Sequence, residues 1–133
     1  MAELSIQDII NKKKECEKRL ETKYTKIGSK FLGGEIKFHS VTKGDILDFR
    51  ERAKSDVRKA SLYFIYISSE TLRNKELLKA YGYDKRDQYK IVETLFPTDA
   101  EQERVLEILL KLNGLDGISP EDIYEEELEE QKN

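Results

Sequence analysis

The residues of this sequence that could take part in catalysis or metal binding are few. It has one histidine, His39, and one cysteine, Cys16. A single cysteine cannot form a disulfide within the chain, and one cysteine with one histidine cannot supply a zinc cage. No serine lies in a Gly-x-Ser-x-Gly sequence, the sharp turn that presents the nucleophile in many hydrolases. We therefore expect no catalytic site, no metal site and no cofactor.

The adjacent glycines Gly33 and Gly34 are the most ligand-like feature of the sequence, because glycine loops that lead into a helix cradle phosphates. Alternating apolar and polar residues flank these glycines on both sides, which is typical of strands rather than of a helix. The pattern therefore predicts a β-hairpin over about residues 22–41, with the two glycines forming a two-residue turn.

A two-residue turn sets the register of this hairpin. It places Phe31 opposite Ile36 and Ser29 opposite Phe38. One face of the hairpin then carries a mostly apolar set of side chains: Ile27, Ser29, Phe31, Ile36, Phe38 and Ser40. We expect this face to pack on a helix. His39 falls on the other face, where an exposed strand histidine is expected rather than a general base.

The rest of the chain shows the apolar spacing and capping residues of helices. The expected helices, in chain order, cover residues 6–20, 42–53, 55–67, 74–81, 85–96 and 98–112. The run L-Y-F-I-Y-I in the third of these also fits a buried strand, but no turn signal separates it from the charged residues before it. Cys16 shares the apolar stripe of the first helix and is expected to be buried. The last helix has the widest apolar surface and is expected to be the central one.

Together these elements predict an α+β fold that is predominantly α-helical. Its N-terminal helix and its one β-hairpin precede a compact helical array, with one globular domain over residues 1–114. An acidic C-terminal helix or frayed tail is expected over residues 115–133.

Charge is unevenly distributed along the chain. Eight basic residues lie from Lys12 to Lys30 against three acidic ones, whereas eight acidic residues after Gly114 stand against one basic residue, Lys132. These charges form either solvated faces that attract each other, within or between molecules, or a tail directed at a partner.

Composition narrows the class of protein. The 133 residues are 38% apolar and 38% charged, and no apolar run approaches the roughly 18–20 residues of a membrane helix. The start of the chain lacks the basic and then apolar pattern of a signal peptide. We therefore expect a cytoplasmic protein without a membrane partner.

Residues 73–90 carry some features of a nucleic-acid surface. Tyrosines that could stack on bases alternate there with cations that could contact phosphates: Tyr81, Tyr83 and Tyr89 with Lys79, Lys85, Arg86 and Lys90. However, Asp84 and Asp87 interrupt the cations, and the sequence pI of about 5.4 lies below the basic range of dedicated binders. Nucleic acid is therefore the less favoured partner.

The order of the segments resembles one protein family. The resemblance begins in S-I-Q-D-I-I-N-K-K-K, L-G-G-E-I-K-F and V-T-K-G-D-I-L-D. It continues through L-Y-F-I-Y-I-S-S-E-T-L-R-N-K-E-L-L-K-A-Y-G and I-V-E-T-L-F-P-T-D-A-E-Q-E-R-V-L-E-I-L-L-K-L-N-G. Over nearly the whole chain, the sequence is similar to the XkdN-like tail assembly chaperones of phages and defective prophages in Gram-positive bacteria.

The resemblance implies a non-catalytic role in tail assembly. Such chaperones bind the tape measure protein, keep it soluble, help tail tube subunits polymerise around it, and are absent from the mature tail. Under this hypothesis, exposed apolar groups among four residues form part of the binding surface, with core burial as the alternative: Tyr63, Tyr66, Leu78 and Tyr81. A structural tail or baseplate component and, less favoured, a small nucleic-acid-binding regulator are the alternative functions. Association between copies of the chain is left open.

Overall fold

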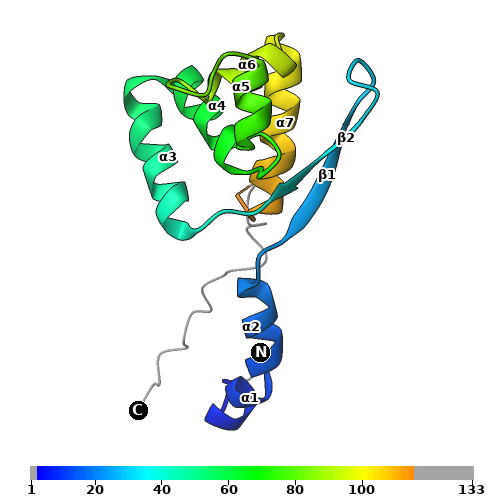
Figure 1. The fold of residues 1–133 in the computed structure, drawn as a ribbon. Coiled ribbons are helices and arrows are strands. Elements are labelled where there is room, and N and C mark those ends of the chain that lie inside the picture. Colours follow the sequence, from blue (N-terminus) through cyan, green and yellow to red (C-terminus); the bar gives the residue numbers. More distant parts are fainter. Residues whose placement is uncertain (1–2, 116–133) are drawn as a thin grey trace.

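The computed structural model describes residues 3–115 and has the predicted α+β architecture, in which helices predominate. Figure 1 shows a helical body from which a two-stranded hairpin and an N-terminal pair of helices project in different directions. The elements, in chain order, are α1 (Ile6–Asn11), α2 (Lys13–Leu20), β1 (Tyr24–Ser29), β2 (Gly34–His39), α3 (Lys43–Ser55), α4 (Val57–Ile67), α5 (Lys75–Ala80), α6 (Lys90–Leu95) and α7 (Asp99–Leu112). The expected acidic C-terminal helix or tail lies outside the described residues, apart from Leu115. No helix within residues 3–115 is both long enough and apolar enough to cross a membrane.

Local capping explains where most helices begin. Ser5, Thr42 and Thr98 each accept a hydrogen bond from the third helical N–H, and the acid at that position accepts one from the capping residue's own N–H. These three predicted capping boxes are confirmed. One predicted start is wrong, because α6 begins at Lys90 instead of residue 85. Asp87 adopts a left-handed φ of 55°, which a continuous right-handed helix cannot contain.

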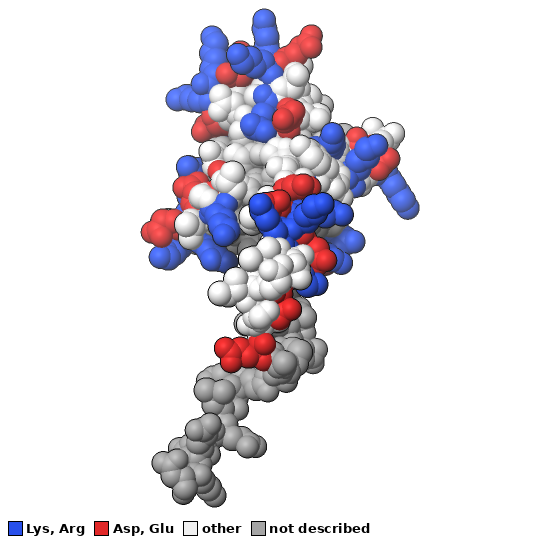
Figure 2. All heavy atoms as spheres, turned by 90° about the horizontal axis from the view of Figure 1, so that it is seen from below, with Lys and Arg blue, Asp and Glu red and all other residues white. Residues whose placement is uncertain are grey.

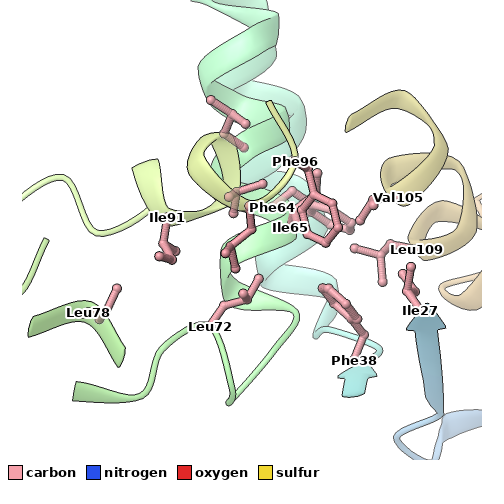
Figure 3. Close-up of a cluster of buried hydrophobic side chains, with 13 residues drawn as sticks. Ile27, Phe38, Phe64, Ile65, Leu72, Leu78, Ile91, Phe96, Val105 and Leu109 are labelled. Atoms are coloured by element: carbon pink, nitrogen blue, oxygen red, sulfur yellow. The ribbon is translucent and has the colours of Figure 1, made fainter. Parts of the chain in front are cut away.

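The core of the body is built around α4, which packs against α3, α6 and α7 (Figure 3). Phe64 and Ile65 of α4 are almost completely buried, and the ring of Phe49 in α3 lies 4.8 Å from that of Phe64. The prediction that α7 is the central helix is therefore wrong. The second half of α4 carries no charged residue, so neighbours can cover it on several sides, whereas α7 alternates apolar residues with charged ones that must stay in water.

The hairpin has a different register from the predicted one. Ile27 pairs with Ile36, and the loop consists of four residues, Lys30 to Gly33. The Ser29 carbonyl accepts a hydrogen bond from the Gly33 N–H at 2.9 Å, and only Gly33 of the two glycines has a positive φ, 78°. The predicted two-residue type I′ turn needs a positive φ at both central residues, and Gly34 does not have one. A four-residue loop with one left-handed glycine therefore joins the strands.

The change of register moves Phe31 out of the sheet but preserves the faces of the strands. The partner of Ile27 shifts by an even number of residues, from Ser40 to Ile36, so each side chain keeps its side. Ile27 and Phe38 are consequently buried, as predicted for the apolar face, and α7 packs against both strands. Phe31 lies in the loop and is 88% exposed, so its predicted place on the packed face is wrong.

Two buried serines fasten the hairpin to the end of α4. The Ser69 hydroxyl donates to the Lys37 carbonyl of β2 at 2.9 Å, and the His39 N–H donates to the Ser68 carbonyl at 2.8 Å. Both serines are completely buried, and their hydroxyls are hydrogen-bonded, so neither leaves an unpaired polar group in the core.

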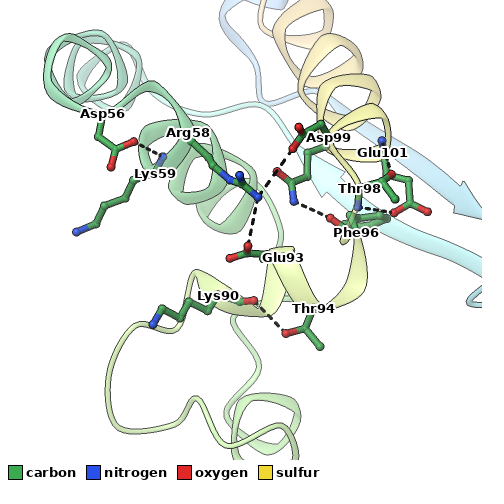
Figure 4. Close-up of polar contacts among 11 residues, drawn as sticks. Asp56, Arg58, Lys59, Lys90, Glu93, Thr94, Phe96, Thr98, Asp99 and Glu101 are labelled. Atoms are coloured by element: carbon green, nitrogen blue, oxygen red, sulfur yellow. Dashed lines mark hydrogen bonds and ion pairs between the residues drawn. The ribbon is translucent and has the colours of Figure 1, made fainter.

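Polar contacts also join α4 to α6 and α7 at the opposite edge of the body (Figure 4). The Arg58 guanidinium lies 3.3 Å from a Glu93 oxygen and 3.8 Å from an Asp99 oxygen. Beneath this surface, the buried Gln102 amide donates to the Phe96 carbonyl at 2.8 Å. Because the Arg58 pairs are exposed, each stabilises the fold by only about 0–1 kcal/mol.

The N-terminal segment, residues 3–20, stands apart from the body, and we call it the arm (Figure 1). Neither α1 nor α2 contributes a buried residue. Lys12, with φ −90° and ψ 2°, separates the two helices, so the single predicted helix over residues 6–20 is wrong. Cys16 is exposed rather than buried, because the body places no element on the apolar stripe of the arm.

Candidate protein-binding surface

The structure brings together two of the four predicted binding residues. Tyr66 of α4 and Leu78 of α5 line one shallow hollow on the body. Leu78 is only 5% exposed and belongs to the core, so the core alternative holds for this residue. Tyr63 lies outside the hollow, with its ring 6.4 Å from that of Tyr66. Tyr81, which caps the C-terminus of α5, is also outside it and is 46% exposed.

Cations share this hollow with its one tyrosine, Tyr66. Arg73, Lys75 and Lys79 share its lining with Tyr66, against one carboxylate, that of Asp84. Burial raises the pKa of the Tyr66 phenol, an effect that the nearby Arg73 charge opposes and the neighbouring Tyr63 reinforces. The hollow therefore combines a half-buried, neutral phenol with a basic rim, which suits a partner that carries acidic groups beside an apolar one.

His39 has a structural role in the same region. Its Nδ1 lies 2.8 Å from the Ser40 carbonyl, and its Nε2 lies 3.3 Å from a guanidinium nitrogen of Arg73. A carbonyl can only accept and a guanidinium can only donate, so Nδ1 carries the proton and Nε2 accepts. Both ring nitrogens are thereby engaged. Within residues 3–115, no group of histidine, cysteine and carboxylate side chains is placed to hold a metal ion.

The largest group of exposed apolar side chains lies on the arm, where the apolar spacing predicts a packed helix. Five of its large apolar side chains are between 55% and 79% exposed: Leu4, Ile6, Ile9, Ile10 and Leu20. The bend at Lys12 gathers Leu4, Ile9 and Cys16 around an open hollow. The apolar spacing did reveal the stripe itself. Nothing in the spacing indicates whether another element of the same chain covers it.

A second exposed apolar site lies at the tip of the hairpin, which projects from the body in a different direction from the arm (Figure 1). Phe31 is 88% exposed and the adjacent Leu32 is 38% exposed. This site has two apolar side chains, whereas the arm has five within residues 4–20. The arm is therefore the better candidate for a protein-binding surface.

The arm combines apolar and charged side chains in a way that suits a helical partner. Viewed from the end at which the arm projects, uncharged surface lies between basic and acidic side chains (Figure 2). Complete burial of one isoleucine or leucine side chain supplies about 1.5–3 kcal/mol, so several of them can sustain reversible binding. An amphipathic helix that packs its apolar face against α1 and α2 would bury the exposed apolar side chains of the arm.

Comparison of the chain with models of protein families, with curated proteins and with solved structures finds no match in any of the three.

Proposed function

We propose that this protein is a non-catalytic tail assembly chaperone of a phage or prophage. In this role it binds the tape measure protein in the bacterial cytoplasm, keeps it soluble and helps the tail tube to polymerise around it. The observation that carries the proposal is the arm, a pair of amphipathic helices whose apolar side chains have no partner among residues 3–115. The resemblance of the sequence to tail assembly chaperones supplies the identity of the client.

The arm has the properties that reversible capture of a helical client requires. Its apolar residues contribute nothing to the core, so their use in binding does not disturb the body. Basic residues in α2 would steer an acidic client toward the arm, and exposed charges would let it dissociate. Several modest contacts release a client more readily than one deep pocket does. The hollow lined by Tyr66 on the body is a second surface on which the client could rest.

Co-expression with a tape measure protein from the same genome tests this function. We expect the wild-type chain to co-purify with the tape measure protein and to increase its soluble fraction. The triple substitution Ile6→Ser, Ile9→Ser and Ile10→Ser should abolish both effects without altering the stability of the fold, because none of these side chains is buried.

A matched control removes exposed apolar groups from the body instead. Leu47 and Val57 are 63% and 65% exposed, so Leu47→Ser with Val57→Ser should leave co-purification intact. Equal loss in both variants would show that capture depends on general surface hydrophobicity and not on the arm. If the wild-type chain neither co-purifies with the tape measure protein nor changes its solubility, the chaperone proposal fails.

Mass spectrometry of purified tail particles distinguishes a chaperone from a structural tail or baseplate component. We expect the chain to be absent from complete particles. Its presence at a fixed ratio to tube subunits would replace the proposal with a structural role. A gel shift whose strength falls steeply between low and high salt would instead indicate nucleic-acid binding through phosphates.

A further inference from the structure

Three of the basic side chains of the arm lack acidic partners within the described part of the chain. Lys12 and Lys13 form ion pairs with Glu15 and Glu17 of the arm itself. The remaining cations of α2 form no ion pair with any acid of residues 3–115: Lys14, Lys18 and Arg19. These cations lie on the same two helices as the exposed apolar side chains. A segment that fits the arm must therefore offer both acidic and apolar residues.

The residues that follow α7 have this composition. Residues 116–133 contain eight acids and one lysine, together with a few spaced apolar side chains, Ile118, Ile123, Tyr124 and Leu128. Tyr124 and Leu128 are four residues apart, so a helical conformation would place them on one face beside Ile123. Ser119 followed by Pro120 is a favourable helix start.

Hydrogen bonds hold the C-terminal end of α7, after which this segment follows, next to the base of the arm. The Asn113 side-chain oxygen accepts from the Val41 N–H at 2.8 Å. Directly before Val41, the Ser40 hydroxyl accepts from the Lys23 N–H at 2.8 Å, and the Lys23 carbonyl accepts from the Ser40 N–H at 2.8 Å. Lys23 is separated from the end of α2 by only two residues. The C-terminal end of α7 therefore lies beside the base of the arm, where the arm joins the body (Figure 1). Ile108, Lys111 and Leu112 of α7 share a shallow hollow with Lys23 and Thr25.

We propose that residues 116–133 of the same chain fold back along the arm and cover its apolar and basic face. Eighteen residues span about 27 Å even as a helix, and the fifteen residues from Ile6 to Leu20 span at most about 22 Å. The segment is therefore long enough to reach the exposed apolar residues from Ile6 to Leu20. In this contact, Ile123, Tyr124 and Leu128 lie against the stripe that includes Ile9 and Cys16, and the glutamates lie against Lys14, Lys18 and Arg19.

Residues 116–133 of the same chain are favoured over those of a second copy, because they are covalently attached close to the arm. A short tether raises the effective concentration of the segment at the arm to about the millimolar range, far above typical protein concentrations. An individually weak contact is then populated without dimerisation. The inference concerns the isolated chain and does not depend on the identity of any client.

Cys16 permits a direct test on the full chain, because it is the sole cysteine of the sequence and is exposed. A nitroxide spin label attached there broadens the amide signals of nearby residues in ¹⁵N-labelled protein. We expect broadening at Ile123, Tyr124 and Leu128 that disappears when the nitroxide is reduced. It should decrease in 1 M NaCl, where the screening length is about 3 Å. The double substitution Tyr124→Ser and Leu128→Ser should remove most of it.

Two further measurements give the test a definite outcome. In a mixture of ¹⁵N-labelled chain without nitroxide and unlabelled chain with nitroxide, the same signals should stay sharp; broadening there would assign the contact to a second copy and overturn the proposal. Without any label, Tyr124→Ser with Leu128→Ser should shift the amide signals of Ile9, Ile10 and Cys16. Unchanged signals in the arm, together with no broadening in residues 116–133, would also overturn it.

Discussion

Two phenylalanines of the hairpin provide the sharpest test of the structure. A two-residue turn at Gly33 and Gly34 would place Phe31 and Phe38 together on the packed face. In the observed register only Phe38 is packed: it is completely buried, whereas Phe31 in the loop is 88% exposed. Separate replacement of each phenylalanine by alanine therefore measures the register through stability.

The expected magnitudes differ by several kcal/mol. Removal of a fully buried phenylalanine ring costs about 3–5 kcal/mol, from lost apolar burial and from the cavity that remains. Removal of an exposed side chain changes the free energy of unfolding by about 0.5 kcal/mol or less. With an m-value of about 2 kcal/mol/M in urea, Phe38→Ala should lower the midpoint of unfolding by about 1.5–2.5 M, and Phe31→Ala by about 0.25 M or less.

Urea titration followed by circular dichroism measures both midpoints. If Phe38→Ala is too unstable to purify, Phe38→Leu retains most of the apolar volume and should cost about 1–2 kcal/mol, still well above the effect of Phe31→Ala. Similar losses for Phe31→Ala and Phe38→Ala would refute the observed register and restore the two-residue turn. A negligible loss for Phe38→Ala would refute the packing of the hairpin on the body.

Three smaller perturbations test other features of the fold. Gly33→Ala should lower the free energy of unfolding by about 1–2 kcal/mol, because Gly33 has a φ of 78°. The control Gly34→Ala should be neutral or stabilise the fold by up to about 1 kcal/mol. Equal effects of the two substitutions in urea titrations would contradict the loop geometry. Asn113→Ala removes the acceptor of the Val41 N–H and should cost about 1–3 kcal/mol, with faster hydrogen exchange at Val41 than in the wild type; unchanged exchange would rule out this bond. The raised pKa of Tyr66 means that the folded state holds this proton more tightly than the unfolded state does. Its contribution to stability is therefore present below about pH 10 and is lost as the pH rises through the folded pKa, a loss that Tyr66→Phe should remove in urea titrations at high pH; identical pH profiles would show that Tyr66 is not perturbed.

The candidate binding surface shows how far sequence interpretation extends. The four residues proposed from the sequence lie on α4, on α5 and at the C-terminal cap of α5. The structure places Tyr66 at a basic hollow but puts Leu78 in the core. The larger exposed apolar surface is on the arm, at residues that sequence spacing had assigned to a packed helix. An apolar stripe has the same pattern whether the chain itself or another molecule covers it, so spacing could not distinguish the two cases.

Interactions between near neighbours in the chain were readable from the sequence. A capping box joins residues three apart, so Ser5, Thr42 and Thr98 could be recognised without knowledge of the fold. The faces of Ile27 and Phe38 also followed from the sequence, because side chains alternate along a strand and an even shift of register preserves their sides. These features together determined the predominantly helical α+β class.

Only the tertiary structure decided the features that depend on distant residues. The contacts between Arg73 and His39 and between Asn113 and Val41 join residues 34 and 72 positions apart, and no local pattern indicates them. The central position of α4, the four-residue loop and the exposure of the arm likewise depend on which surfaces fit together. Burial is a property of the whole packed chain, because each apolar stripe competes for the same limited core, and the stripe of the arm is left in solvent.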